Sequence, residues 1–307
     1  MLSFMSARIL LNEAPRRLTR QCPEWPQGLA DLAEPPAQLF VGGQLPPLAH
    51  SVAIVGTRAA DEEACRFTRQ LARELAQAGA VIVSGGAAGI DGEAHRGALE
   101  VGGRTVAILA LGLHRAYPAQ HAPLFAQIAR SGALLCETEV QPEPARGYLF
   151  LRRNRLIAAL ADTLVVVQAP YKSGALSTAR EAKRLKRHVF AVPAAPWDLR
   201  GTGCLELLRT GTEICSSAAD ILSVAGLGRP ARVGAARKSR KNVSDNDGLA
   251  KEVRSVWRVA RNGPVHPDQI SATLDMPAAE VQEALLTLLL LGLCRQRADG
   301  TYVACGS

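Results

Sequence analysis

Aromatic residues are scarce in this 307-residue sequence: they make up 4% of it, although 48% of the residues are hydrophobic. A large core must therefore be built mainly from Ala, Val, Leu and Ile, which suit helices packed closely on a sheet. No apolar run approaches the ~18–20 residues of a membrane span. Arg8 interrupts the apolar N-terminus, and no small-residue cleavage site follows it. We expect a soluble, cytoplasmic protein with no signal peptide and no membrane partner.

Paired cysteines are also absent. The seven cysteines are scattered, with no CxxC pair and no histidine at metal-ligand spacing. An odd, dispersed set is typical of reduced thiols in a cytosolic protein, and it argues against a disulfide framework or a zinc site. We predict no bound metal and no cofactor.

Acidic residues are fewer than basic ones, and the formal net charge is +8. The excess is uneven: residues 51–225 and 226–248 each carry +4, whereas residues 1–50 and 249–307 are each neutral. A basic protein favours an anionic partner, of which nucleic acid is the commonest. The charge therefore points to the central part of the chain and one adjoining segment.

Residues 51–225 alternate short apolar runs with amphipathic segments. The runs predict strands at Val52–Gly56, Val81–Ser84, Thr105–Ala110, Ala133–Glu137, Thr163–Gln168 and Val189–Val192. The segments between and after them predict helices at Asp61–Gly79, Asp91–Val101, Pro123–Arg130, Asn154–Ala161, Ala175–Arg187 and Leu205–Arg209. Repeated βα units predict an α/β fold with a Rossmann-like, doubly wound parallel sheet, which binds ligands at the carboxyl ends of its strands.

The flanking segments differ from this domain. Residues 1–50 are rich in Pro and Gly, and we expect an extended N-terminal segment that packs on the next domain. Residues 226–248 are basic and poor in apolar residues, which is typical of a flexible linker. Residues 249–307 predict a small winged-helix domain. Its helices are Ala250–Arg261, His266–Thr273 and Pro277–Leu291, and its hairpin strands Leu293–Arg297 and Thr301–Ala304 flank Asp299-Gly300.

Two common nucleotide signatures are missing from the domain at 51–225. It has no GxGxxG after its first strand and no Walker Lys-Ser/Thr, which excludes the usual dinucleotide and ATP–Mg²⁺ sites. The first strand ends instead in Gly56-Thr57-Arg58. An arginine there faces the ligand crevice, and its planar guanidinium suits phosphate. We predict phosphate binding at these three residues; the alternative is that Arg58 is a solvated surface residue.

A glycine-rich loop, Ser84-Gly85-Gly86-Ala87-Ala88-Gly89, follows the second predicted strand and precedes a helix. Its glycines would let backbone N–H groups point at an anion, and the helix dipole adds to the attraction. We predict a phosphate site at Ser84, Gly85, Gly86, Ala87 and Gly89. The alternative is a tight packing turn.

Arginines are concentrated at Arg152-Arg153-Asn154-Arg155, which opens the predicted helix Asn154–Ala161. Cations at a helix N-terminus are disfavoured by the helix dipole, so a bound anion would explain them. Phe150 could stack a base, although core packing is at least as plausible. Ser173-Gly174 adds a further small-residue turn before a helix on the same edge. We predict that these residues bind nucleic acid.

Asp91 and His95 are four residues apart on one predicted helix face. The pair could perform acid–base chemistry, but no nucleophile accompanies it. The favoured interpretation is that Asp91 caps the helix and His95 hydrogen-bonds it in place. We predict no catalytic residue.

Five ordered segments between Ala37 and Leu222 together resemble the DprA/Smf (DNA-processing protein A) family. They are VAIVGTR (52–58), VSGGAAGIDGEAH (83–95), RRNRLIAALA (152–161), SGALSTA (173–179) and VFAVP (189–193). Two positions depart from the family pattern: Gln168 stands where the family often has Glu, and Ala194 replaces the usual Gly. These departures concern details of the pocket.

The resemblance implies a homodimeric protein, not an enzyme, that binds single-stranded DNA. It also implies that the protein protects incoming DNA and loads the recombinase RecA during natural transformation. The family's phosphate-binding role would fall on Arg58, the 85–89 loop and the 152–155 cluster.

Alternatives from other classes stay open. A nucleotide-binding enzyme or sensor of the phosphoribohydrolase-like Rossmann group could use Asp91 with His95 or Glu137, and a scaffold with a vestigial DNA site is a third interpretation. In the winged-helix domain, the third helix carries Glu280, Gln282 and Glu283 and no Lys or Arg. Such a helix would repel phosphate, so we expect this domain to bind protein or to assist oligomer contacts, and not to read bases.

Overall fold

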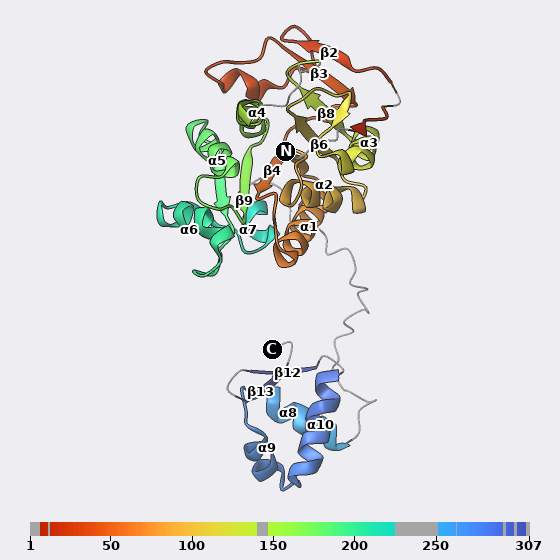
Figure 1. The fold of residues 1–307 in the computed structure, drawn as a ribbon. Helices are drawn as coiled ribbons and strands as arrows, with labels where there is room; N and C mark the ends of the chain where they lie inside the picture. Colours follow the sequence, from red (N-terminus) through yellow and green to blue (C-terminus); the bar gives the residue numbers. More distant parts are fainter. Residues whose placement is uncertain are drawn as a thin grey trace. The chain divides into compact units, whose positions relative to one another are not determined.

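The structure is a computed structural model that describes residues 7–11, 13–139, 147–224, 251–261, 263–290, 293–297 and 300–304. The chain divides into two compact units, Met1–Val233 and Gly234–Ser307 (Figure 1). The predicted linker at 226–248 lies outside the described residues. In the described part of the chain, no helix is long and apolar enough to cross a membrane, and none of the six cysteines there forms a disulfide bond.

A nine-stranded sheet forms the centre of the first unit, in the order β11-β10-β9-β4-β5-β6-β8-β3-β2. All strand pairs from β11 to β8 are parallel. The six predicted strands are confirmed. They are β4 (Ser51–Gly56), β5 (Val81–Ser84), β6 (Thr105–Leu109), β8 (Ala133–Cys136), β9 (Thr163–Val167) and β10 (His188–Ala191), and β11 (Glu213–Ile214) adds an edge that the sequence did not predict.

Helices cover both faces of this sheet, which confirms the doubly wound Rossmann-like class (Figure 1). On one face lie α1 (Glu62–Gln77), α2 (Ile90–Glu100), α3 (Ala122–Ser131) and α7 (Ala218–Leu222). On the other lie α4 (Gly147–Ala159), α5 (Gly174–Arg184) and α6 (Thr202–Arg209). Short helical turns η1 (Gln27–Asp31), η2 (Ala119–His121) and η3 (Leu199–Gly201) complete the unit.

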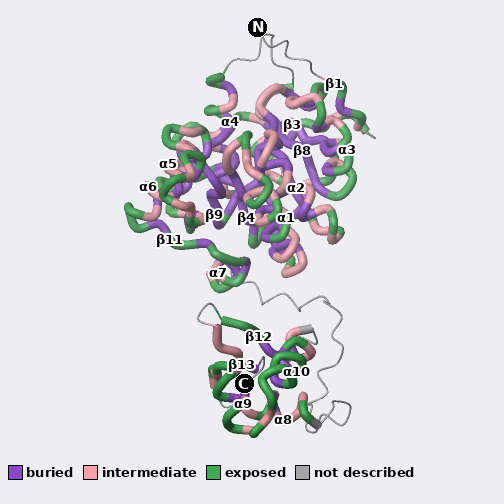
Figure 2. Tube along the Cα trace, turned by 60° about the horizontal axis from the view of Figure 1, so that its bottom comes forward, coloured by how far each residue is buried: buried purple, intermediate pink, exposed green. Residues whose placement is uncertain are grey.

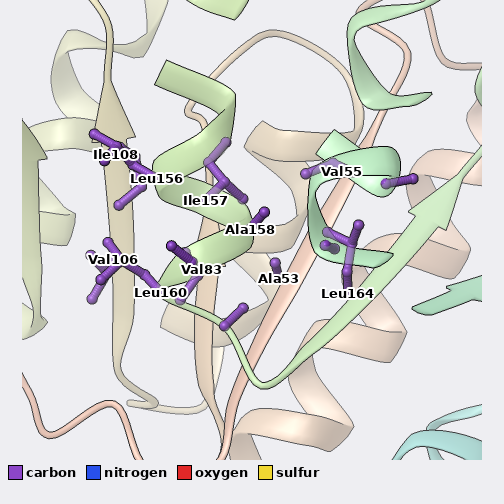
Figure 3. Packing of buried hydrophobic residues seen from close by; sticks show 14 of the residues in the cluster. Ala53, Val55, Val83, Val106, Ile108, Leu156, Ile157, Ala158, Leu160 and Leu164 are labelled. Carbon is purple, nitrogen blue, oxygen red and sulfur yellow. The ribbon is translucent and has the colours of Figure 1, made fainter. Parts of the chain in front are cut away.

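The alternation of side chains along each strand builds the two core layers. Ala53 and Val55 pack under α4 and α5, whereas their neighbours Val52 and Ile54 pack under α1 and α2. Figure 3 shows Leu156, Ile157, Ala158 and Leu160 of the α4 segment lying over Val83, Val106 and Ile108 of the sheet. Because both faces are buried, the strands are nearly continuous apolar runs, as parallel strands between helices usually are.

The N-terminal segment, predicted as an extended stretch over residues 1–50, contributes strands to the sheet. β2 (Arg16–Thr19) and β3 (Gln38–Gly43) extend the sheet: β3 pairs antiparallel with β8, and β2 pairs antiparallel with β3. A two-residue strand, β1 (Ala7–Arg8), pairs with β7 (Arg115–Ala116) beyond β6. The prolines of this segment lie outside these short strands, so they remove no ladder hydrogen bond from the sheet.

The second unit has the predicted winged-helix order of three helices and a hairpin. They are α8 (Lys251–Arg261), α9 (Pro267–Leu274), α10 (Ala278–Leu290), β12 (Cys294–Gln296) and β13 (Tyr302–Ala304). Figure 2 shows buried positions of this unit on the inward sides of its helices. On α10, Val281, Leu285 and Leu288 are buried, whereas Glu280 and Glu283 are exposed. The outer face of α10 is therefore acidic, as the sequence suggested.

One helix boundary differs from the prediction in a way that matters for function. α4 begins at Gly147, seven residues before the predicted start at Asn154. The arginines at 152–155 therefore lie within the helix and not at its N-terminus. The predicted unfavourable contact of these arginines with the helix N-terminus is therefore absent, and no bound anion is needed to offset it.

Candidate nucleic-acid interface

The carboxyl ends of β4, β5, β6 and β9 meet at one edge of the sheet, as expected of parallel strands in a doubly wound fold. A groove of about 550 Å³ opens there. It is bounded by the end of β4, the start of α4 and the turn before α5, with Arg58, Phe150 and Ser173 among its lining residues. A side pocket of about 100 Å³ continues from it between the 85–88 loop and residues 109–112. Arg58, Phe150 and Arg153 line both hollows.

A stack of three side chains stands at the junction of the groove and the side pocket. The guanidinium carbon of Arg58 lies 5.0 Å from the ring centroid of Phe150. The ring of Tyr117 lies on Phe150 with a centroid distance of 5.2 Å. Arg58 is exposed, and among the described residues it makes no ion pair. The cation–π contact holds this guanidinium in place without neutralising its charge.

The glycine-rich loop after β5 already holds an anion, which belongs to the chain itself. Oδ2 of Asp91 accepts hydrogen bonds from the backbone N–H groups of Gly85, at 3.2 Å, and Ala87, at 3.3 Å. Burial raises the pKa of Asp91, although the nearby Arg153 opposes that shift. Two donors predicted to bind an external phosphate are therefore occupied by a side chain in the first turn of α2.

Gly89 sets the path of the same loop toward β4. Its φ of +72° lies in a region that side chains rarely adopt, and an added Cβ would collide with the carbonyl oxygen of Thr57. The next residue, Ile90, donates its N–H to that oxygen at 3.2 Å. The loop is thus fastened to the end of β4, which places Thr57 and Arg58 beside it.

Arg153 is buried and not a surface ligand for phosphate. Its side chain donates to the carbonyl oxygens of Gly85 and Ile108, which fastens α4 to the ends of β5 and β6. Only 7% of the residue is exposed. Burial lowers its pKa to about 10, so it remains charged at neutral pH. It contributes positive potential to the floor of the groove and shapes the loop above it.

The other two arginines of the cluster, Arg152 and Arg155, line neither the groove nor its side pocket. Arg155 donates to both carboxylate oxygens of Glu137 at 2.7 Å and to the carbonyl of Glu34 at 2.7 Å. Arg152 donates to the same Glu137 at 2.9 Å. These ion pairs tie α4 to the segment after β8. They also occupy Glu137, one of the acid–base candidates of the enzyme alternative.

His95 does not pair with Asp91, which corrects the predicted capping arrangement. Its Nδ1 lies 2.7 Å from Oγ1 of Thr105, and that hydroxyl donates to the carbonyl of Ile82 at 2.8 Å. The Thr105 proton is thereby used, so Nδ1–H of His95 must be the donor. Burial lowers the pKa of His95 to about 3. His95 is therefore a neutral core residue at physiological pH and not a proton carrier.

Besides the N-terminus of α2, the N-terminus of α5 also lies at the groove. No side chain of its own accepts a capping hydrogen bond there. Ser173 is the N-cap residue, yet its hydroxyl makes no capping bond. Among the described residues that hydroxyl has no hydrogen-bond partner at all. Asn154 donates to the carbonyl of Gly174 at 3.1 Å and holds this turn against α4. The positive end of the α5 dipole thus faces the groove beside Arg58.

Most of the predicted residues come together at this edge. Ten line the groove or its side pocket: Gly56, Thr57, Arg58, Gly85, Ala87, Phe150, Arg153, Asn154, Ser173 and Gly174. Five line neither: Ser84, Gly86, Gly89, Arg152 and Arg155. Ser84 is buried and donates to the carbonyl of Ile54 at 2.6 Å, and Gly86 packs against Phe125.

Sequence reasoning missed the segment after β6. Leu109, Ala110, Leu111 and Gly112 wall the side pocket, together with Arg115 and Tyr117. The segment has no dense glycine or arginine motif. Its position could have been found from the topology, because this segment follows the carboxyl end of a predicted parallel strand, just as the other loops of the site do.

Comparison with known proteins bears on both units. The family model of DNA recombination-mediator protein A matches residues 16–226, and the DprA winged helix domain model matches residues 243–300. The chain belongs to the DNA recombination-mediator protein A (DprA/Smf) family.

Relatives in this family are similar along most of their length. The chain is 34% identical to Protein Smf of Synechocystis over 94% of this chain and 80% of that protein. It is 37% identical to a putative DNA processing protein DprA of Mycobacterium tuberculosis over 96% and 78%, respectively. These matches confirm the resemblance found in the sequence.

Solved DprA structures share the fold. DNA processing protein A of Streptococcus pneumoniae superimposes with a TM-score of 0.64 at 31% identity, over 68% of this chain and 74% of that one. DNA processing protein A of Helicobacter pylori, described for its single-stranded DNA binding mode, gives 0.60 at 34% identity, over 68% and 94%. The chain is therefore a member of a family of DNA-processing proteins with a shared α/β architecture.

Proposed function

We propose that this DprA-family protein binds single-stranded DNA in the groove at the carboxyl edge of its sheet. The observation that carries the proposal is Arg58, an exposed guanidinium held 5.0 Å above the Phe150 ring at the mouth of the groove. A cation beside an aromatic face offers one group for phosphate and one for a base, the combination that single-strand binders use. The Helicobacter pylori relative, described for this binding mode, supports the same conclusion.

The arrangement of charges indicates which groups meet phosphate. Arg58 and the uncapped Ser173–Gly174 turn of α5 offer donors at the groove, and Arg153 adds positive potential from below. The N–H groups of Gly85 and Ala87 already donate to Asp91. We therefore assign phosphate binding to the Arg58 and Ser173 side of the groove, and we assign the glycine-rich loop to the wall of the side pocket.

We also propose that the protein acts without catalysis. Each acid–base candidate of the enzyme alternative already has a structural partner. Asp91 accepts from the loop after β5, His95 bonds to Thr105, and Glu137 pairs with two arginines. By analogy with its family, we propose that it is a cytoplasmic homodimer that protects incoming DNA and loads RecA during natural transformation. Basic residues along the groove are the feature of this chain that supports the DNA-binding part of that role.

The test is fluorescence anisotropy of labelled oligo-dT across a salt series. Wild-type affinity should fall as salt rises, with a log–log slope of about −0.7 for each phosphate neutralised. Arg58→Ala should weaken binding and make the slope shallower by about one phosphate. Phe150→Ala should weaken binding with little change in slope, because stacking releases no counterions.

A matched control is Arg184→Ala. Arg184 is an exposed arginine at the other end of α5, paired with Glu181 at 3.2 Å. It should leave both affinity and slope unchanged. If the wild type fails to bind oligo-dT at low salt but binds a mononucleotide, the nucleotide-sensor alternative replaces this proposal. RecA loading is the next measurement, as the rate of RecA filament growth on DNA covered by single-strand-binding protein.

A further inference from the structure

Three large apolar side chains stand in solvent beside the groove, on the turns that follow β9 and β10. Tyr171 is 65% exposed, Trp197 83% and Leu199 77%. Exposed aromatic side chains gathered in one region generally mark a binding surface. The mechanism proposed above uses none of the three.

The two turns that carry these side chains are joined by hydrogen bonds. The backbone N–H of Tyr171 donates to Oγ1 of Thr202 at 3.0 Å, and that hydroxyl donates to the carbonyl of Leu199 at 2.9 Å. Nε2 of Gln168, at the end of β9, donates to the Asp198 carboxylate at 3.0 Å. Tyr171 and Trp197 are therefore presented by backbone segments of fixed conformation.

The surface is continuous with the groove. Pro170 and Ser173, on either side of Tyr171, line the groove itself. β10 lies next to β9 and β9 next to β4, all parallel, so their carboxyl ends form one row. With strands ~4.8 Å apart, the turn after β10 begins about 10 Å along the edge from the end of β4. A strand leaving the groove past Ser173 would meet Tyr171 and then Trp197.

The local charges suit an anionic chain with flat bases. The Lys172 ammonium lies 5.6 Å from the centroid of the Tyr171 ring, which repeats the cation–aromatic pairing of Arg58 and Phe150. The nearby carboxylates of Asp61 and Asp198 are each bridged by Arg200 at 2.9 Å. They therefore present less negative charge to a passing phosphate than two unpaired carboxylates would.

We propose that Tyr171 and Trp197 form a second stacking platform, which binds bases of the same single strand after it leaves the groove, with Lys172 meeting the intervening phosphate. This inference rests on the proposed function and adds a subsite to it. An unpaired base has a π-face whatever its identity, so the platform would lengthen the footprint without adding sequence preference.

The experiment compares a short and a long oligo-dT, of roughly 4 and 16 nucleotides, the range that single-strand-binding folds cover. Tyr171→Ala and Trp197→Ala should each weaken binding of the long oligonucleotide about tenfold, as the loss of one stacked base predicts. Neither should change binding of the short one, which the groove accommodates. Trp197→Phe should retain most of the affinity because a ring remains.

Two further measurements separate stacking from other causes. Leu199→Ala removes an equally exposed apolar side chain without a ring, and it should leave both affinities unchanged. Intrinsic fluorescence of the wild type should be quenched by the long oligonucleotide, and this quenching should disappear in Trp197→Phe.

Three outcomes would overturn the platform. Equal losses for short and long oligonucleotides would indicate disturbance of the groove. A loss of affinity in Leu199→Ala as large as that in Trp197→Ala would indicate an apolar contact. A changed sedimentation mass in Trp197→Ala would assign the surface to a second copy of the chain. Arg58→Ala is measured in parallel and should weaken binding of both the short and the long oligonucleotide. This result distinguishes the three outcomes from failure of the proposed function.

Discussion

The carboxylate of Asp91 occupies the anion position of the loop that precedes it, with Oδ2 3.2 Å from the backbone nitrogen of Gly85. A loop that looks like a phosphate cradle in the sequence is thus completed by its own helix. This closed arrangement fixes the wall of the side pocket, and it leaves Arg58 and the start of α5 as the groups that we propose contact DNA.

Asp91→Ala should destabilise the protein. It leaves the buried N–H of Gly85 without its acceptor, at a cost of about 1–3 kcal/mol, and the partly buried N–H of Ala87 loses the same acceptor. Urea unfolding of the two proteins measures the difference. Asp91→Asn, which keeps one acceptor oxygen, should lose less. Equal stability of Asp91→Ala and wild type would mean that the loop does not depend on this carboxylate.

Arg153→Ala should mainly reduce the stability of the protein, whereas Arg58→Ala should mainly reduce its affinity for DNA. Arg153 is buried, and its removal strips two carbonyl acceptors of their donor and leaves a cavity, so a loss of about 3–5 kcal/mol in unfolding free energy is expected. Arg58 is exposed, and its removal should change stability by less than ~0.5 kcal/mol while weakening DNA binding. Thermal unfolding and anisotropy on the same samples check both. Identical stability of the two variants would contradict the burial of Arg153.

Gly89→Ala should be more destabilising than Gly102→Ala. Both glycines have positive φ, +72° and +66°, so each substitution incurs strain. Only at Gly89 would the added Cβ also strike the Thr57 carbonyl, whereas nothing lies within 4 Å of one at Gly102. We expect about 1 kcal/mol for Gly102→Ala and several times that for Gly89→Ala. Denaturant midpoints provide the comparison, and a reversed order would refute the close approach of loop and strand.

Stability should fall as the solution is acidified below about pH 6.5. Burial lowers the pKa of His95 to about 3, and burial also lowers that of His121. Between about pH 6.5 and pH 3 the unfolded chain binds a proton at His95 that the folded protein does not, so His95 costs about 1.4 kcal/mol of unfolding free energy per pH unit, and His121 acts in the same direction. Unfolding free energy measured from pH 7 to pH 4 should show this slope.

His95→Gln tests the assignment of that slope. The glutamine amide can still donate to Thr105 but does not titrate, so the slope should become shallower by about one proton. An unaltered slope in His95→Gln would assign the acid sensitivity to other groups.

Much of the fold followed from local pattern. The six parallel strands were predicted because burial on both faces makes each an apolar run, and most helices because their amphipathic faces and caps are local. Asp61, for example, caps α1 by accepting from the N–H of Ala64 at 2.7 Å. The start of α4 was missed because Gly147 and the residues after it carry no capping signal and mix polar with apolar side chains.

The sequence by itself determined the succession of elements, the edge where the candidate site lies and the residues proposed there to bind phosphate, because these depend on neighbours along the chain. The tertiary structure alone decided which of those residues face the groove. Arg58, Arg153 and Arg155 have the same chemistry, yet one is exposed over Phe150, one is buried against two carbonyls and one is paired with Glu137. The physical reason is that burial and partners come from segments distant in sequence, and they decide whether a charge is available to a ligand.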